Sequence, residues 1–389
     1  MENFTKNKNC FICSKPIKIL IKLKNFPNIE TFVSRRRKNK QNKNDQSFCF
    51  CDKCVHGQLF LTIKKEKQNK YKFRSSKSII VDENTENFLN FFNKIKKKKS
   101  SLMEIGCNDG HLLRKLKNNF RYIYGIDPIF NKNKVLEKKI RLIGLDIEKD
   151  LVEKKIKKKF DVIICRHTIE HFEKPKITLD KILKMSSKNA IIFFEFPELS
   201  SMITKERFNY IFNEHLSYFS LKSFLILLKK YKAKIIDINY DYTSWGTIMI
   251  AFKINQSKSN LNSFKLTHIS KKQILDNYKN FLIQNKIIIN KLKKIKYNFL
   301  CYGASELITI QNYHLKNKLK KAKFIIDDSK FKINKMLLSL NSRITSPNKI
   351  RHIIKNKSIL ITATHAIHKI LPKLVKFNPK KIINNHFII

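Results

Sequence analysis

A strand, a glycine turn, a helix and a second strand follow one another between residues 101 and 127, and this order restricts the fold more than any other feature. Apolar residues around Met103 predict the first strand, Gly106 permits a tight turn, and Gly110 lets the helix start pack near the sheet. Asp127 ends the second strand, where an acidic side chain accepts hydrogen bonds from both hydroxyls of a ribose. The segment therefore predicts a nucleoside-binding α/β unit, although it lacks the Gly-x-Gly-x-x-Gly pattern of dinucleotide-binding proteins.

The alternation of short apolar and helical segments continues along the chain and predicts three units. We expect a loop-rich module over residues 1–75, a parallel-sheet unit over 76–253, and a helical linker with a smaller α/β unit over 254–389. The linker helix is expected from about Ser270 to Lys296. The hydrophobic content of 42% is enough to bury two or three cores. The predicted strands are SLMEIG, RYIYGID, FDVIICR, NAIIFFEF, YNFLCYG, KAKFIID and SILITAT.

Two Cys-x-x-Cys pairs in the N-terminal module predict a metal site. Their four thiols suit a tetrahedral Zn²⁺ ion, and they belong to Cys10, Cys13, Cys51 and Cys54. Cys49 and His56 are alternative ligands that lie outside this spacing, and metal-free cysteines are the other interpretation. A closed four-sulfur site has no position for water, so the metal is expected to stabilise a small module and not to take part in chemistry.

The net charge of +52 raises the question of a nucleic-acid partner. Lysine carries most of this charge, whereas arginine is the residue that contacts phosphate and guanine bidentately. Lys, Asn, Ile and Phe are abundant together, and they share A/T-rich codons, so a base-composition bias explains the excess. A functional basic surface, which would also attract an anionic substrate, is the alternative. We do not expect nucleic acid as the partner.

The sequence predicts no membrane span. No apolar run approaches the roughly 18 residues that a bilayer requires. The N-terminal sequence MENFTKNKNCFICSKP lacks the apolar core of a secretory signal, so we expect a cytoplasmic protein.

The turn after the first strand resembles that of class I S-adenosylmethionine-dependent methyltransferases, with Glu-x-Gly-x-x-x-Gly followed by an acid after the next strand. The resemblance implies a Rossmann-like sheet and S-adenosylmethionine as methyl donor. It also implies that the loop after the strand FDVIICR lines the donor pocket, with Glu104 and Gly106 at the methionine end and His167 at the edge. The residues expected to bind the donor are Glu104, Gly106, Asn108, Gly110, Asp127 and His167.

Over almost its whole length the chain also resembles the sugar-nucleotide C-methyltransferases of deoxysugar biosynthesis. The shared features, in order, are the cysteine pairs followed by Gly-Gln-Leu at 57–59, the donor turn, and Glu-His-Leu-Ser-Tyr-Phe-Ser at 214–220. The C-terminal unit adds Tyr-Gly-Ala-Ser at 302–305 and Ile-Asp-Asp-Ser-Lys at 326–330. The resemblance implies methyl transfer to a nucleotide-linked keto or deoxy sugar, as C-methylation in surface glycan or deoxysugar biosynthesis.

C-methylation beside a ketone requires a base that removes an α-proton before the carbanion attacks the methyl sulfonium. Histidine suits this role, and a neighbouring carboxylate can orient it. We therefore expect His215 as the base and Glu214 as its partner or as the ligand of a substrate hydroxyl. The alternative is that both residues cap the helix near Leu221. Tyr218 is expected to pack or to line the substrate site, and His171 is expected at a helix start, where a cap is the simpler role.

The chain departs from this family at two places. Phe212 and Asn213 precede Glu214-His215, where the family has Tyr-His-Glu-His, and Ser-Trp-Gly-Thr at 244–247 replaces Gly-Gly-Ser followed by Arg. Trp245 is expected to line the acceptor pocket or to fill a gap. The alternative functions are O- or N-methylation of a glycan precursor, methylation of RNA or DNA, and a non-catalytic adaptor. No Asn-Pro-Pro-Tyr motif of base-flipping enzymes is present.

The C-terminal unit is expected to cover the active-site cleft and to hold the nucleotide of the acceptor. Tyr302, Gly303 and Ala304 lie at a predicted strand-to-helix turn, where backbone amides can receive a phosphate. A plain turn is the alternative interpretation.

Overall fold

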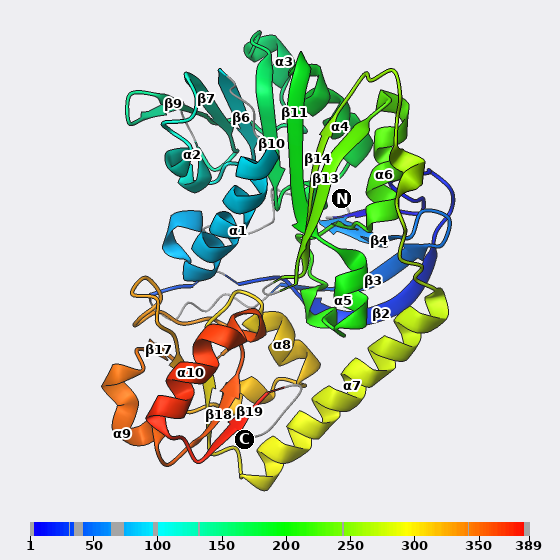
Figure 1. Cartoon of the computed structure of the whole chain (residues 1–389). Coiled ribbons are helices and arrows are strands. Elements are labelled where there is room, and N and C mark those ends of the chain that lie inside the picture. Colours follow the sequence, from blue (N-terminus) through cyan, green and yellow to red (C-terminus); the bar gives the residue numbers. More distant parts are fainter. Residues whose placement is uncertain are drawn as a thin grey trace.

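The computed structural model describes residues 4–30, 32–34, 42–63, 74–95, 100–130, 133–242, 245–340 and 342–384. Most of the predicted basic loop RRRKNKQNKN and Ser244 lie outside the described residues. Within them, the chain forms the large central sheet and the C-terminal α/β unit that the sequence predicts, and a sheet in the N-terminal module, which the sequence predicts to be loop-rich (Figure 1). The predicted fold class, a Rossmann-like unit flanked by a small cysteine-bearing module and a C-terminal α/β unit, is confirmed.

The central sheet has eight strands in the order β13-β14-β11-β10-β6-β7-β9-β8. Strands β6, β7, β9, β10 and β11 are parallel, whereas β14 runs antiparallel to both β11 and β13, and β8 runs antiparallel to β9. The strand bounds are β6 Ser101–Ile105, β7 Tyr122–Ile126, β8 Lys134–Leu136, β9 Ile140–Ile143, β10 Phe160–Arg166, β11 Ser186–Pro197, β13 Lys234–Asp241 and β14 Thr247–Lys253. The order reverses between β6 and β10, and ligands of open α/β sheets bind outside the carboxyl ends of the strands at such a point.

Helices cover both faces of this sheet. Adjacent strand residues point to opposite sides, and the side chains on both sides are apolar and buried. Phe193 of β11 packs with Phe88 and Phe92 of α1 on one face, and its neighbour Phe194 packs with Phe224 of α6 on the other. The helix bounds are α1 Ile79–Ile95, α2 His111–Lys115, α3 Val152–Lys155, α4 Pro175–Lys184, α5 Leu199–Thr204 and α6 Leu221–Leu228.

The N-terminal module contains a second sheet that is not built from that module alone. Its order is β12-β4-β3-β2, and β12 comes from the segment Glu-His-Leu-Ser-Tyr-Phe-Ser more than 150 residues further along the chain. Ser217 pairs with Gln58, and Tyr218 pairs with Gly57. A short ribbon of β1 and β5 completes the module. The bounds are β1 Phe4–Lys6, β2 Lys18–Pro27, β3 Lys43–Cys51, β4 His56–Leu59, β5 Leu61–Ile63 and β12 Ser217–Tyr218.

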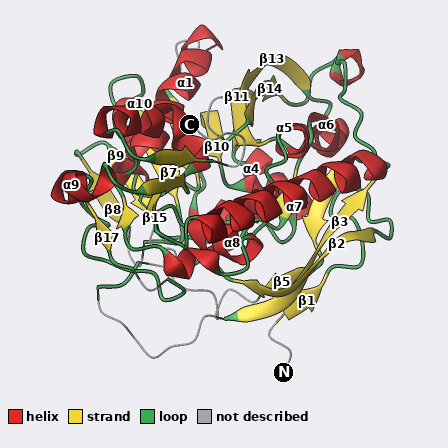
Figure 2. Cartoon of the chain, turned by 90° about the horizontal axis from the view of Figure 1, so that it is seen from below, coloured by secondary structure: helices red, strands yellow, loops and turns green. Residues whose placement is uncertain are grey.

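A long helix, α7 (Lys271–Lys294), runs down one side of the molecule from the N-terminal sheet to the C-terminal unit (Figures 1 and 2). Ser270 caps it by accepting a hydrogen bond from the amide of Gln273 at 3.1 Å, close to the predicted start. The C-terminal sheet is wholly parallel, in the order β17-β16-β15-β18-β19. The bounds are β15 Phe299–Tyr302, β16 Ile325–Ile326, β17 Ile344–Thr345, β18 Ser358–Ile361, β19 Lys381–Ile383, α8 Ile308–His314, α9 Arg351–Ile354 and α10 Ile367–Phe377.

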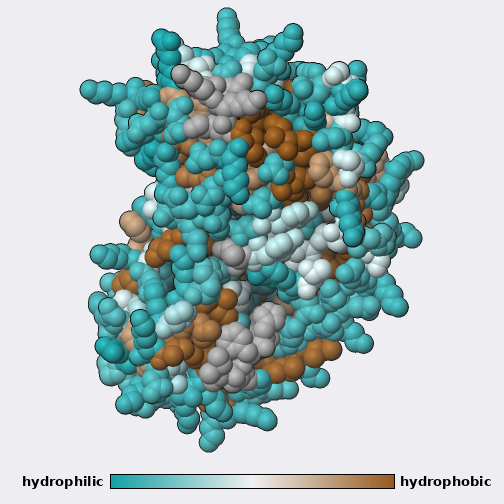
Figure 3. Space-filling model, viewed as in Figure 1, coloured by the Kyte–Doolittle hydropathy of each residue, from teal (hydrophilic) through white to brown (hydrophobic). Residues whose placement is uncertain are grey.

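The face of the molecule in Figure 3 is mostly hydrophilic, with separate hydrophobic patches, as expected for a chain with 82 Lys and Arg residues. In the described part of the chain, none of the helices combines the length and the apolar character that crossing a bilayer requires.

Candidate active site

The turn after β6 packs directly against the loop after β10. Gly106 has φ of +72°, and a Cβ atom on it would lie 2.1 Å from Oγ1 of Thr168, which follows β10. Gly110 also has positive φ, +78°, and begins α2. Both glycines therefore occupy backbone conformations that other residues rarely adopt. At Gly106 the group that approaches the backbone closely is the side chain of Thr168.

Asp127 lies at the carboxyl end of β7 and fixes the shape of the turn. Its carboxylate accepts hydrogen bonds from the amides of Asn108, at 2.8 Å, and Ile129, at 2.9 Å. Burial raises the pKa of Asp127 above its usual range, and these two amides act against that rise. Each carboxylate oxygen keeps further acceptor capacity, so the contacts found leave the predicted hydrogen bonds to a ribose diol chemically possible.

Asn108 connects the turn to the segment before α1. Its side-chain oxygen accepts hydrogen bonds from the amides of Ser75, at 3.1 Å, and Asp109, at 2.9 Å. Asp109 in turn accepts from the amide of Ser76 at 3.3 Å. Asn108 and Asp109 thus hold Ser75 and Ser76, respectively, against the turn.

Glu104 is a buried acid at the end of β6, and its Oε2 atom has no hydrogen-bond partner among the described residues. Burial raises the pKa of this carboxyl group to about 8, although Arg166 acts to lower it. An unpartnered buried oxygen calls for a hydrogen-bond donor, and a ligand bearing an ammonium group meets that need. This residue therefore fits the predicted methionine end of S-adenosylmethionine.

A buried ion pair lies beside Glu104. Arg166, the last residue of β10, donates from Nε to the Glu195 carboxylate of β11, which has no exposed surface. Burial alone would raise the pKa of Glu195, but Arg166 and His167 hold it at about 2. Glu195 is therefore charged at neutral pH.

His167 lies next to this ion pair in a strained conformation, with φ of +47°. Its Nε2 is 3.4 Å from Glu195 Oε1, and its Nδ1 is 3.7 Å from Glu170 Oε1. Burial alone would lower the pKa of His167, but the two carboxylates raise it to about 9. The ring also meets Trp245 edge-on, with centroids 4.8 Å apart. His167 is thus a cation at the edge of the predicted donor site.

The segment with Glu214 and His215 is held against the end of β10. The amide of Leu216 donates to the carbonyl of Glu170 at 2.8 Å, and Nδ1 of His171 is 2.7 Å from the carbonyl of Glu214. These two bonds bring the rings of His171 and His215 to a centroid distance of 4.7 Å. The structure therefore gathers both predicted catalytic residues and His171 beside the donor turn.

Burial shifts the pKa values of His215 and Glu214 in opposite directions. Burial, followed by the neighbouring His171 and His167, lowers the pKa of His215 well below its usual range, so its ring is neutral at neutral pH. Burial raises the pKa of Glu214 to about 7, and Glu306 of the C-terminal unit contributes to that rise. Among the described residues no hydrogen bond joins the Glu214 carboxylate to the His215 ring. The direct pairing expected from the sequence is therefore not formed.

The residues at which the chain departs from the sugar-nucleotide family have structural contacts. Phe212 packs on His215, with ring centroids 3.9 Å apart. Asn213 is buried and points to the N-terminal module, where it accepts from Gln46 Nε2 at 2.9 Å and donates to Asn28 Oδ1 at 2.6 Å. The hydroxyl of Tyr218 accepts a hydrogen bond from the amide of Phe212 at 3.2 Å, which fixes the backbone before Glu214.

The first β-α-β part of the C-terminal unit repeats the hydrogen bonds of the donor turn. Asp327, at the end of β16, accepts from the amides of Ala304, at 2.8 Å, and Ser329, at 2.9 Å, as Asp127 does from Asn108 and Ile129. Gly303 has φ of +103° and donates to a β16 carbonyl, as Gly106 donates to one of β7. Both amides of the predicted phosphate site are therefore already bonded within the chain.

Trp245 lies between the central sheet and the C-terminal unit. Its ring meets His167 on one side and His365 on the other, with a centroid distance of 6.1 Å to His365. It packs with hydrophobic residues of both units. Trp245 thus lies at the border between the central sheet and the C-terminal unit.

The four predicted zinc ligands converge. The sulfur atoms of Cys10, Cys13, Cys51 and Cys54 all lie within 4.8 Å of one another, and those of Cys13 and Cys51 are 3.7 Å apart. Zn–S bonds of about 2.3 Å in a tetrahedron separate the sulfurs by about 3.8 Å. The donor set and its geometry therefore fit Zn²⁺.

The two alternative ligands point elsewhere. Cys49 is fully buried, and burial raises the pKa of its thiol to about 12. His56 packs against Phe219, and burial lowers the pKa of His56 to about 3. Neither belongs to the group of converging sulfurs.

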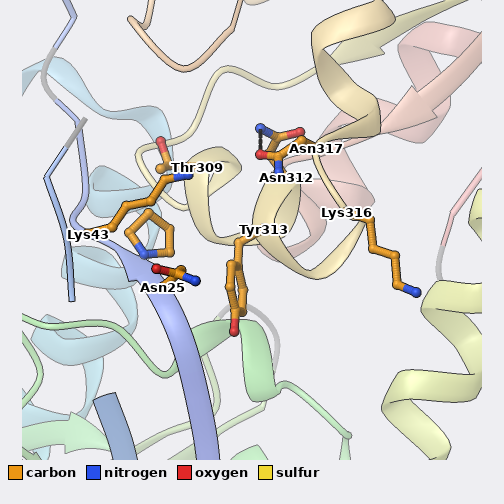
Figure 4. Close-up of a pocket in the computed structure, with 8 residues that line it drawn as sticks. Asn25, Lys43, Thr309, Asn312, Tyr313, Lys316 and Asn317 are labelled. Atoms are coloured by element: carbon orange, nitrogen blue, oxygen red, sulfur yellow. Dashed lines mark hydrogen bonds between the residues drawn. The ribbon is translucent and has the colours of Figure 1, made fainter. Parts of the chain in front are cut away.

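A separate polar pocket of about 260 Å³ lies between the N-terminal sheet and α8. Figure 4 shows Lys43 and Thr309 on one side of Tyr313 and Lys316 extending on the other. None of the predicted site residues lines it.

Several polar residues of the site were not expected from the sequence as site residues. They are Arg166, Glu170, Glu195, Glu306 and His365. The first three lie at or after strand ends of the central sheet, and acids or bases at such ends are a usable signal. Glu306 and His365 come from the C-terminal unit, so only the arrangement of the two units reveals them.

Comparisons with known proteins agree with this arrangement. A family model described as "Methyltransferase domain" matches residues 80–237. The C-methyltransferase NovU of Streptomyces niveus is 22% identical over 152 residues, which are 38% of this chain and 36% of NovU. The match therefore spans about a third of the length of that relative.

Similar solved structures include two methyltransferases. N-methyltransferase NodS from Bradyrhizobium japonicum WM9, in complex with S-adenosyl-L-homocysteine, is 15% identical, with 48% of this chain and 94% of NodS covered and a TM-score of 0.36. An S-adenosylmethionine-dependent methyltransferase from Clostridium acetobutylicum ATCC 824 is 13% identical, with 44% and 91% covered and a TM-score of 0.35. The family match and the strand order identify residues 80–237 as a class I S-adenosylmethionine-dependent methyltransferase domain.

Proposed function

We propose that this chain transfers a methyl group from S-adenosylmethionine to a carbon atom of a nucleotide-linked keto or deoxy sugar. The observation that carries the proposal is the meeting of His171, Glu214 and His215 beside the donor turn. The name of NovU, a C-methyltransferase, supports a carbon acceptor. The repeat of the Asp127 contacts at Asp327 supports a nucleotide-bearing acceptor, because it gives the C-terminal unit the same frame.

The residues of the chain suggest a division of roles. S-adenosylmethionine, when bound, supplies an electrophilic methyl group. Asp127 accepts hydrogen bonds from its ribose, and Glu104 faces its cationic methionine end. The neutral ring of His215 takes the α-proton of the acceptor, and Glu214 binds an acceptor hydroxyl through its unpartnered Oε2. Orientation of the two reactants at the end of β10 lowers the barrier further.

Mass spectrometry with isotope-labelled donor and a panel of nucleoside-diphosphate 4-keto sugars tests the function. We expect one labelled methyl group on a ring carbon of one of these sugars. His215→Ala should lower kcat by about 10²- to 10⁴-fold with donor affinity unchanged, since it removes only the base. The exposed His268 provides the control, and His268→Ala should retain full turnover.

Two results would contradict the proposal. Label on a ring oxygen or nitrogen would replace C-methylation with O- or N-methylation. Tight donor binding without product from any sugar nucleotide would favour an adaptor.

We further propose that Cys10, Cys13, Cys51 and Cys54 hold a structural zinc ion. The sulfur spacing described above supports this. The protein purified without added metal should contain one zinc per chain by elemental analysis, and Cys13→Ser should lose it.

A further inference from the structure

A buried carboxylate and two imidazoles meet where β10 ends. The ligand atoms of Glu170, His171 and His215 all lie within 4.8 Å of one another. We propose that these three side chains form a second metal site, for a divalent transition-metal ion such as Zn²⁺ or Co²⁺. This group shares no residue with the four cysteines.

The carboxylate of Glu170 is buried and, within the described part of the chain, lacks hydrogen-bond partners. It is 2% exposed, and neither of its carboxylate oxygens has a hydrogen-bond partner among the described residues. A buried carboxylate without donors is unfavourable unless a positive charge neutralises it. The imidazole of His167 lies 3.7 Å away, but Glu195 shares it at 3.4 Å. A metal ion between Glu170 and the two histidines would give the Glu170 carboxylate oxygens the partner that they lack among the described residues.

His171 already has the orientation of a metal ligand. A carbonyl oxygen only accepts, so the 2.7 Å contact between its Nδ1 and the carbonyl of Glu214 requires a proton on Nδ1. The lone pair of the neutral ring is then on Nε2. Histidines that bind metals usually donate their other nitrogen to a carbonyl or carboxylate in this way.

The backbone keeps the three ligands together. The amide of Leu216 donates to the carbonyl of Glu170 at 2.8 Å, and a turn from Phe212 to His215 is closed by an amide-to-carbonyl bond of 3.0 Å. Metal bonds of about 2.1 Å in a tetrahedron place ligand atoms about 3.4 Å apart. Small rotations of the side chains therefore close the site without a backbone movement.

The ligand set selects the class of metal. Two imidazoles and one carboxylate suit borderline ions of the first transition row, whereas Mg²⁺ and Ca²⁺ prefer oxygen ligands. Three protein ligands leave positions open for water or for an acceptor oxygen.

Metal binding and proton transfer compete for His215. A bound ion takes up the ring nitrogen that the proposed function assigns to the α-proton, so the loaded protein is inactive. This second half of the inference rests on the proposed function, whereas the metal site itself does not.

Co²⁺ titration of the zinc-containing protein tests the site. We expect one Co²⁺ per chain beyond the zinc, with d–d absorption bands but without the sulfur-to-metal charge-transfer bands of a cysteine site. Glu170→Gln and His171→Ala should each weaken this binding at least tenfold. The exposed His268 gives the matched control, because His268→Ala removes an imidazole outside the site. Pulsed electron paramagnetic resonance with Cu²⁺ on the unaltered protein should detect two coordinated imidazoles, and it does not depend on the folding of a variant.

The outcomes separate the two proposals. No additional Co²⁺, or unchanged binding in both variants, overturns the metal site, and so does a Cu²⁺ spectrum with fewer than two imidazoles. Turnover that stays high with Co²⁺ bound overturns the competition and the role of His215 as base, while the metal site stands. Loss of turnover in His215→Ala, together with no Co²⁺ binding by the unaltered protein, overturns the metal site and supports the proposed function.

Discussion

The buried side chain of Glu104 is expected to make the affinity for the methyl donor depend on pH. Its carboxyl group is 5% exposed at the end of β6, and burial holds its pKa at about 8. In the unliganded protein at pH 7 this group is therefore mostly protonated. A cationic ligand favours the charged form and so expels the proton.

We predict that donor affinity rises with pH between 6 and 9. Below pH 8, binding to the unaltered protein should release up to one proton, and affinity should fall by up to about tenfold per pH unit. Calorimetry in two buffers of different ionisation enthalpy measures this release. Glu104→Gln should bind the donor more weakly and lose this component of the pH dependence. Equal proton release in both proteins would assign the titration to another group.

At the scale of the element, the turn after β6 depends on the packing of two loops. Gly106 has φ of +72°, and the side chain of Thr168 fills the space that a Cβ atom needs. The turn and the loop after β10 therefore cannot move independently.

We predict that Gly106→Ala weakens donor binding at least tenfold and destabilises the domain by about 1–3 kcal/mol, since it adds backbone strain and a collision. Donor calorimetry and thermal unfolding check this. Thr168→Ala removes the two closest side-chain atoms, so the double variant should recover part of the loss. No recovery would mean that backbone strain alone, and not the contact between loops, causes the defect.

The sequence predicts those elements whose signal is local. Apolar runs around Met103 and Ile163 mark β6 and β10, and the spacing of the cysteine pairs marks the sulfur cluster. Long-range partners have no such signal. The two residues of β12 are too few to predict a strand, and their partner β4 lies far away in sequence. Nor does the sequence reveal that Asn213 accepts a hydrogen bond from Gln46, because an amide side chain can form its hydrogen bonds with water equally well.

The whole molecule depends on contacts between its units. The N-terminal sheet includes β12, and α7 joins that region to the C-terminal unit. The C-terminal unit in turn brings Glu306 close enough to Glu214 to raise the pKa of Glu214.

We predict that loss of zinc abolishes acceptor turnover before donor binding. Cys13 is the least buried of the four cysteines, so Cys13→Ser removes a ligand with little loss of packing. The module should unfold, because structural zinc contributes on the order of 10 kcal/mol or more, and β12 then loses its partner. Donor calorimetry should change little. Cys49→Ala, outside the cluster, should keep both zinc and turnover, and equal damage from both variants would contradict the metal role.

We also predict that Glu306→Gln shifts the acidic limb of kcat/KM. The pKa of Glu214 is about 7, raised first by burial and also by Glu306. If the charged carboxylate binds the acceptor, activity falls as pH drops through this value. Removing the Glu306 charge should move the limb to lower pH, as a pH–rate profile would measure. An unmoved limb would mean that Glu214 does not govern it.

The pairing of β12 with β4 has a consequence for synthesis of the chain on the ribosome. Gln58 pairs with Ser217, which lies 159 residues further along the chain. At about 5–20 residues per second, the nascent chain carries the open edge of β4 for roughly 10–30 s. An unpaired strand edge is a template for association with other chains. Early capture of metal by the cysteines would keep this edge in a folded frame until its partner emerges.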